Sequence, residues 1–250
     1  MKASEMKKIA EIAIHEENYT SMIENARDYI AMDGRPLTVS ETKSFIGIHI
    51  TTAHTGKMEG MWSLSSSCPL NDNCIAHAKV KGNICEHCFA DALMKMRKSM
   101  RIPLDQNYRI LNSAEIPTEL WPLLNVRFFR FESFGDLAST TQVRNYFNLC
   151  RRNPETRFAL WTKNYRFVKE AIEAGNEKPA NLVIIVSSIM MDRHLDIAHY
   201  PYADKIFTVY TDEETAAEKG ATINCGKRHC LTCGRCYRKF TDVYVNELLR

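Results

Sequence analysis

Several features of membrane and secreted proteins are missing from this sequence of 250 residues. It has no apolar run near the ~20 residues needed to cross a bilayer. Its first residues, 1–8, lead into an amphipathic segment and not into the apolar core of a secretion signal. A strong excess of one charge is also missing, because the net charge is only +3. We therefore expect no membrane partner and a cytoplasmic location, and the weak positive charge permits an acidic partner without requiring one.

The sequence also lacks internal repeats, low-complexity tracts and linkers. Its apolar fraction of 45% is ordinary for a chain that folds around a full core. Single barrels of this length are common, so we expect one α/β domain over residues 41–250. A helical segment over residues 1–40 precedes it, because apolar residues recur there at three- and four-residue intervals. This periodicity predicts one helix over residues 4–32.

Cysteine, by contrast, is abundant, and eight of the nine cysteines fall into two groups of four. The first group is Cys68, Cys74, Cys85 and Cys88, and the second is Cys225, Cys230, Cys233 and Cys236. These spacings in a chain without an export signal favour metal ligation over disulfides. We therefore expect metal loops at residues 68–88 and 225–236. The remaining Cys150 lies in an apolar helical pattern and is predicted to be a core residue.

The second group has the spacing of an iron–sulfur site. The two-residue gaps between Cys230, Cys233 and Cys236 match the first three ligands of the bacterial ferredoxin run. Three closely spaced thiolates suit a cuboidal [4Fe-4S] cluster, and Cys225 would ligate its fourth iron. Zinc fingers and ribbons more often use two Cys-x2-Cys pairs about a dozen residues apart. A structural zinc site nevertheless remains open as the alternative.

The first group fits either an iron–sulfur loop or a zinc loop, so one or two [4Fe-4S] clusters are expected, with zinc possible at one group. His77 or His87 is an alternative ligand there. A helix is predicted to start at Phe89, directly after the group. The N–H groups at the start of a helix stabilise thiolate charge, which favours a bound cluster or deprotonated ligands.

From residue 126 onwards, strands and helices alternate regularly. The predicted strands are residues 126–133, 157–163, 181–188 and 205–211, and the predicted helices are residues 140–152, 165–174 and 212–219. An earlier apolar run over residues 45–50 also predicts a strand. This alternation predicts a mainly parallel sheet with helices outside it, and a partial (β/α) barrel is one form of such a sheet.

Polar residues collect where these strands end, which is where barrels and open sheets place their chemistry. We predict that Glu132 or Asp136 acts as general base or acid and that Lys163 holds an anionic substrate, so these three are the candidate catalytic residues. Candidate substrate-binding residues at similar positions are His54, Lys57, Ser187 and Tyr210. Each has a structural alternative; for example, Asp136 would also serve as the cap of the following helix.

Basic residues surround the second cysteine group and follow the first. They are Lys219, Lys227, Arg228, His229, Arg235, Arg238 and Lys239 around the former, and Lys95, Arg97, Lys98 and Arg101 after the latter. Such cations either offset the charge of thiolate ligands or contact phosphate groups. A nucleotide or a nucleic acid is therefore the candidate partner.

Several motifs resemble those of known families. Cys68-Pro, Cys85-x2-Cys88-Phe-Ala, the segment 130–136, Trp161-Thr-Lys163 and the terminal cysteines follow one another in one order. Over about residues 45–240, this order resembles a family of cysteine-rich phage and prophage gene products without an assigned reaction. The Cys85-x2-Cys88 ending also resembles that of radical S-adenosylmethionine enzymes, which hold a [4Fe-4S] cluster on a partial (β/α) barrel. Because the chain lacks their Cys-x3-Cys-x2-Cys run, this second resemblance implies a similar barrel more than radical chemistry.

Three functions are consistent with these patterns. The first is an iron–sulfur enzyme that acts on a nucleotide or a nucleic-acid base, with Glu132, Asp136 and Lys163 as catalytic residues. The second is a nucleic-acid-binding module without turnover, shaped by zinc. The third is a zinc-containing barrel enzyme that exchanges bases in nucleic acid, with Asp136 as nucleophile.

Overall fold

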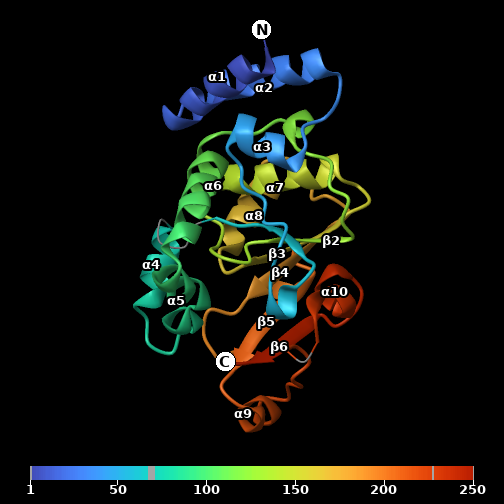
Figure 1. Cartoon of the computed structure of the whole chain (residues 1–250). Coiled ribbons are helices and arrows are strands. Elements are labelled where there is room, and N and C mark those ends of the chain that lie inside the picture. Colours follow the sequence, from blue (N-terminus) through green and yellow to red (C-terminus); the bar gives the residue numbers. More distant parts are fainter. Residues whose placement is uncertain (1, 67–70, 227, 250) are drawn as a thin grey trace.

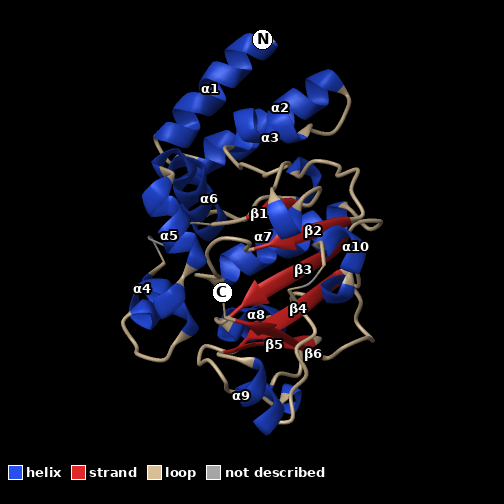
Figure 2. Ribbon diagram, turned by 60° about the horizontal axis from the view of Figure 1, so that its bottom comes forward, coloured by secondary structure: helices blue, strands red, loops and turns tan. Residues whose placement is uncertain are grey.

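Six strands form one sheet in the computed structural model, which describes residues 2–66, 71–226 and 228–249. The strands are β1 (Trp62–Leu64), β2 (Phe128–Phe131), β3 (Arg157–Thr162), β4 (Leu182–Ser187), β5 (Lys205–Tyr210) and β6 (Tyr244–Leu248). All neighbours pair in parallel, and their order in the sheet is their order in the chain. The predicted parallel α/β sheet is confirmed (Figures 1 and 2).

This strand order makes the two faces of the sheet unlike. Crossovers between parallel neighbours are right-handed, and here each one steps across the sheet in the same direction. The helices that connect β2 to β3 and β3 to β4 therefore lie on one face, where α7 (Thr140–Arg152) packs beside α8 (Tyr165–Glu173). This strand order is consistent with both a partial (β/α) barrel and an open parallel sheet.

The two faces pack into different hydrophobic clusters. On β3, Phe158 and Leu160 belong to the large cluster under the helices, whereas Ala159 and Trp161 pack in a smaller cluster on the opposite face. This alternation follows from the pleat of a strand, which points successive side chains to opposite faces. We call the helix-covered side the outer face. The inner face is the side that carries Phe128, Ala159, Trp161, Val183 and Ile185.

The N-terminal helical segment contains more than the one predicted helix. Residues 4–32 form α1 (Ala3–His15) and α2 (Tyr19–Asp33), so the prediction of a single helix is wrong. The break occurs because Glu17 adopts a positive φ of 56° and Asn18 caps α2, its side chain accepting a hydrogen bond from the Ser21 N–H at 3.1 Å. Figure 1 shows these two helices stacked beyond α3, away from the sheet.

The strand predicted over residues 45–50 is also wrong, because α3 (Val39–Ile46) begins this segment. Thr38 and Glu41 form a capping box, in which the Glu41 N–H donates to Thr38 Oγ1 at 3.2 Å and the Thr38 N–H donates to Glu41 Oε2 at 2.9 Å. Gly47 then ends the helix with a φ of 75°. The local capping residues thus outweigh the β propensity of the run.

The remaining helices are α4 (Asp72–Ala78), α5 (Phe89–Met96), α6 (Arg101–Ser113), α9 (Glu213–Glu218) and α10 (Cys230–Cys233). Helix α7 has its predicted bounds, and β2 to β5 are shorter than predicted by one or two residues at their ends. Within the described parts of the chain, no helix has the length and apolar character that a membrane span requires.

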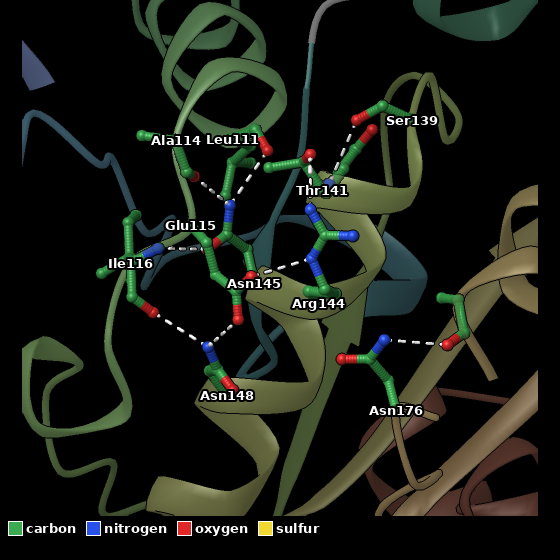
Figure 3. A network of polar contacts seen from close by, with 12 residues as sticks. Leu111, Ala114, Glu115, Ile116, Ser139, Thr141, Arg144, Asn145, Asn148 and Asn176 are labelled. Carbon is green, nitrogen blue, oxygen red and sulfur yellow. Dashed lines mark hydrogen bonds and ion pairs between the residues drawn. The ribbon is translucent and has the colours of Figure 1, made fainter. Parts of the chain in front are cut away.

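The loop between α6 and β2 is fixed to α7 by the buried side chain of Asn145. Its Nδ2 donates to the carbonyls of Leu111 (2.9 Å) and Ala114 (2.8 Å), and its Oδ1 accepts from the Ile116 N–H at 2.7 Å. Figure 3 shows this side chain among its backbone partners. Three backbone groups therefore depend on one amide for their hydrogen bonds.

We expect Asn145→Ala to lower the free energy of unfolding by about 3 kcal/mol, because it leaves buried backbone groups unpaired. Urea unfolding measures this loss. Asn176→Ala is the matched control, since the Asn176 side chain donates only to the Ala171 carbonyl (2.9 Å), which also accepts from the Asn176 N–H. The control should lose less than about 1 kcal/mol. Equal losses in the two variants would contradict this role of Asn145.

Candidate functional site

The two cysteine groups lie in different parts of the molecule. In both ribbon views, α4, which carries Cys74, and α5, which Cys88 directly precedes, lie on the opposite side from α10, which carries Cys230 and Cys233 (Figures 1 and 2). The first group follows β1, and the second lies between β5 and β6. Any two metal centres would therefore be separate.

The second group begins at a fixed point on the edge of β6. The Cys225 N–H donates to the Asn246 carbonyl at 3.0 Å. The neighbouring Asn224 side chain accepts from the Asn246 N–H at 2.9 Å and donates to the Tyr244 carbonyl at 2.9 Å. The loop thereby satisfies the backbone of this edge strand, and the strand in turn positions Cys225.

The rest of the loop lies on the inner face of the sheet. Helix α10 ends at Gly234, whose φ is 59° and where an added Cβ would lie 3.0 Å from the ring of Phe128. Tyr237 then stacks on the same Phe128 ring, with 4.6 Å between centroids. A glycine is needed at residue 234 for both its conformation and this close approach. These contacts bring Cys230 and Cys236 against the inner face.

All four cysteines of the second group line one cavity of about 300 Å³, which we call the thiol cavity. The loop side of the thiol cavity consists of Cys225, Cys230, Cys233 and Cys236. Its sheet side includes Arg130, Trp161, Phe207, Val245 and Glu247. The cysteine spacing predicted that these thiols share one metal centre; the structure places them on one cavity, and the metal centre stays a prediction.

The cations of the thiol cavity differ in their partners. Lys57 Nζ lies 2.7 Å from Glu247 Oε1 and 3.8 Å from Cys225 Sγ. Arg235 Nε pairs with the Asp242 carboxylate at 2.8 Å. Arg130 instead places its guanidinium 4.1 Å from the centre of the Trp161 ring. Two of these three cations are thus neutralised by carboxylates of the chain.

Burial favours the protonated form of three thiols of the cavity, those of Cys225, Cys230 and Cys236. Burial raises the pKa of Cys236 to about 12, with a further rise from the charge of Cys225. Burial also raises the pKa of Cys225 and Cys230. Metal binding would therefore have to release protons from these thiols, which makes the affinity for a metal depend on pH.

The first cysteine group lies at the carboxyl ends of the strands. We call Cys74, Cys85, Cys88, Asp136 and Lys163 the rim group. Burial lowers the pKa of Lys163, but the charges of Asp136 and the three cysteines outweigh it, so the pKa is raised. The cysteine loop is tied to the end of β4, because the Ile84 N–H donates to the Ile189 carbonyl at 2.9 Å. The predicted fourth ligand, Cys68, lies outside the described residues.

Within the described residues, no three His, Cys, Asp or Glu side chains are close enough together to hold a metal ion. The two metal loops therefore stay a prediction. The donor set of the thiol cavity has the right chemistry all the same, because four thiols on one cavity are what an iron–sulfur or a zinc site needs.

Glu132 is buried and fully occupied by hydrogen bonds. Its Oε1 accepts from Gln142 Nε2 at 2.7 Å and from the Tyr146 hydroxyl, both on α7. Its Oε2 accepts from the N–H and the hydroxyl of Ser66 at 3.2 and 3.1 Å. Burial raises the pKa of Glu132 to about 8, so the carboxyl is mostly protonated at neutral pH.

Asp136 accepts hydrogen bonds from the Thr162 hydroxyl at 2.6 Å and from the Lys163 N–H at 2.9 Å. These bonds fix the turn after β2 to the end of β3, so the carboxylate has a structural task at the rim. Glu132 lies near enough for the charge of Asp136 to contribute to its raised pKa. The three predicted catalytic residues are thus neighbours, but none of them lines the thiol cavity.

The four predicted substrate-binding residues are dispersed. Lys57 lines the thiol cavity. His54 Nε2 lies 2.8 Å from the Ser63 hydroxyl, and burial, followed by the charge of Arg130, lowers its pKa. Ser187 is buried at the end of β4, and Tyr210 is buried with a hydroxyl that has no hydrogen-bond partner in the described parts of the chain. These four residues do not share the thiol cavity.

The prediction missed three residues that shape the thiol cavity, namely Arg130, Tyr237 and Glu247. A signal for Arg130 was present in the sequence, because Arg130 lies between Phe129 and Phe131 in β2. Both phenylalanines face the outer core. Alternation along a strand places such a residue on the opposite face.

A comparison with protein families matches residues 35–241 to the family described as Gene product 88. The chain belongs to the Gene product 88 family. The resemblance to phage gene products is thereby confirmed. Searches among curated proteins and among solved structures find no match to the chain.

The matched part of this Gene product 88 protein contains both cysteine groups and β1 to β5. Helices α1 and α2 precede it, and β6 follows it. The thiol cavity therefore combines the cysteines of the family segment with Val245 and Glu247 from a strand outside that segment.

The raised pKa of Glu132 predicts a pH dependence of stability. The folded state binds this proton more tightly than the unfolded state, where the pKa is near its ordinary value of 4.5. The contribution of this proton to the free energy of unfolding is therefore complete below about pH 4.5. It decreases as the pH rises to about 8, by at most about 1.4 kcal/mol per pH unit. We expect Glu132→Gln to flatten the decline in the free energy of unfolding between about pH 5 and pH 7.5.

Urea unfolding at several pH values tests this expectation. Glu155→Gln is the control, because Glu155 is exposed and should leave the pH profile of the wild type unchanged. A Glu132→Gln variant that keeps the wild-type slope would show that Glu132 ionises at its ordinary pKa in the folded protein.

Proposed function

We propose that this Gene product 88 protein is an iron–sulfur enzyme that acts on a nucleotide or a nucleic-acid base. The observation that carries the proposal is the thiol cavity, which is lined by four cysteines far from the rim group. Thiol-ligated clusters require a reducing environment, so the proposal includes a cytoplasmic location.

Two observations favour a cluster over a single zinc ion in the thiol cavity. The Cys-x2-Cys-x2-Cys spacing of Cys230, Cys233 and Cys236 is that of ferredoxin ligands. The four thiols also line the loop side of the thiol cavity, and within the described residues no three of them are close enough together to hold one metal ion. A zinc ion would need four sulfurs at about 2.3 Å from a single point. A cluster distributes its ligands over several iron atoms and suits the wider arrangement better.

A bound cluster would supply electron transfer or Lewis-acid chemistry. The chain's own residues would exclude water and offset negative charge. Trp161 and Tyr237 meet edge to face, with 6.3 Å between ring centroids, and form an apolar wall against bulk water. Arg130 and Lys57 face the thiols and would stabilise their deprotonated form, since their charges already lower the pKa of Cys230 against the larger effect of burial.

The rim group is the proposed second metal centre. Cys74, Cys85 and Cys88 lie around Lys163 at the carboxyl ends of the strands, which is where partial (β/α) barrels of the radical S-adenosylmethionine type hold their cluster. The proposal includes a similar scaffold but not radical chemistry. If Cys68 completes the set, four cysteine ligands would leave no iron open to that cofactor.

The contacts of the rim suggest roles for the predicted catalytic residues. Lys163 would bind an anionic part of the substrate, because its ammonium stays charged beside Asp136. Asp136 would orient Lys163 through the backbone hydrogen bond at 2.9 Å. Glu132 fits a structural role better than an acid–base role, because both of its oxygens are occupied by hydrogen bonds inside the core.

The second candidate function is a zinc-shaped module that binds nucleic acid without turnover. The basic surface supports it: Arg228 at the cavity and Arg97 after the first group are exposed. In this case each cysteine group would hold one zinc ion, and no absorption in the visible range would be expected.

Metal analysis of protein purified without oxygen separates these functions. We expect brown protein that contains about four irons per cluster and absorbs broadly near ~400 nm, as thiolate-bound clusters do. Cys230→Ser and Cys236→Ser should each remove the iron bound at the thiol cavity. Cys150→Ala is the control: it removes a buried thiol from α7 and should leave the metal content unchanged. Colourless protein with zinc would favour the second function, and metal-free wild-type protein would contradict both.

A further inference from the structure

Arg130 occupies an unusual place for a charged residue. It is the third residue of β2, and its backbone neighbours Phe129 and Phe131 both pack into the outer core. Its side chain therefore projects from the inner face at the second strand of the sheet and lines the thiol cavity. The guanidinium lies 4.1 Å from the centre of the Trp161 ring, within the range of a cation–π interaction.

Within the described parts of the chain, this guanidinium has no carboxylate partner. Among the described residues, no carboxylate lies within 4.0 Å of Arg130, whereas Lys57 and Arg235 each have one. Its Nε is buried without an acceptor in the same set of residues, and its Nη1 contacts only the weakly accepting Met58 Sδ at 3.6 Å. A buried guanidinium N–H without an acceptor is costly unless a ligand such as an anion completes the site.

The surroundings of Arg130 also fit an aromatic ligand. Trp161, Phe207 and Tyr237 contribute rings to the lining of the same cavity. Its volume of about 300 Å³ lies at the lower end of the range for small-molecule sites. Arg130 and these rings come from the sheet side, while the thiols lie along the loop, so a ligand on the sheet side would face the thiols.

We propose that the thiol cavity binds a nucleotide and that Arg130 anchors its phosphate group. The inference deepens the proposed function, on which it rests for the choice of a nucleotide as ligand. A planar guanidinium offers two parallel N–H donors, which match two oxygens of one phosphate, and this geometry is one that lysine cannot reproduce. The aromatic wall would contact the base or sugar of the same ligand.

Isothermal titration of the anaerobically purified protein with adenosine monophosphate, adenosine and inorganic phosphate tests the proposal. We expect adenosine monophosphate to bind more tightly than either fragment. Arg130→Gln should weaken its binding by about tenfold or more, because a charge-assisted pair of hydrogen bonds is lost. Arg130→Gln should leave the weaker binding of adenosine unchanged. Arg130→Lys, which keeps the charge but not the planar fork, should bind with intermediate affinity.

Arg127→Gln is the matched control. Arg127 comes from the same segment and lies over an aromatic ring, 4.9 Å from the centre of Phe128, but it is exposed and does not line the cavity. Its replacement should leave nucleotide affinity unchanged. Thermal unfolding of all variants shows whether Arg130→Gln folds, and Arg130→Lys serves as the test variant if it does not.

Three results would overturn the proposal: no binding of adenosine monophosphate to the wild type, equal binding by wild type and Arg130→Gln, or an equal loss in Arg127→Gln. Iron and zinc are measured in every sample. Nucleotide binding through Arg130 in a protein that holds no iron would contradict the iron–sulfur proposal and support this inference. An iron-loaded protein with no affinity for adenosine monophosphate would contradict this inference and support the iron–sulfur proposal.

Discussion

The strand order of the sheet determines where the cysteine loop must go. Parallel strands that follow one another without reversal collect their helices on one face, so the opposite face needs another cover. Phe128, Ala159, Val183 and Ile185 are buried on that inner face, and Tyr237 from the loop packs with them. The segment that carries four cysteines is therefore also the segment that shields part of the core from water. A loop with so few apolar side chains would gain rigidity from a metal that cross-links its thiols.

Sequence patterns predicted the middle of the sheet well and its periphery poorly. Strands β3 and β4 are largely buried on both faces and consist mainly of apolar residues, so their composition identifies them. The edge strands β1 and β6 depend on partners elsewhere: β1 has three residues, and β6 satisfies its outer edge through Asn224. The N-terminal errors arose from capping, because Asn18 and the Thr38–Glu41 box override the apolar periodicity and β propensity of the segments that they border.

The candidate site was predictable only in part, for a similar reason. Cysteine spacing is local, so it indicated that the residues 225–236 would gather. The burial of Glu132 was not predictable, since it depends on Gln142 and Tyr146 one helix further along the chain. The position of Arg130 over Trp161 depends on the pairing of β2 with β3, in which Arg130 is aligned with Ala159. Both cases need the register of the sheet, which no short motif contains.

If a metal fastens the cysteine loop to the inner face, removing it should loosen that loop before the rest of the fold. Hydrogen–deuterium exchange of metal-loaded and chelator-treated protein measures this directly. We expect the amides of residues 225–239 to lose protection when the metal is removed, while those of α7 and β4 keep theirs. Unchanged protection of residues 225–239, in a preparation whose metal is demonstrably gone, would contradict a metal held by these four cysteines.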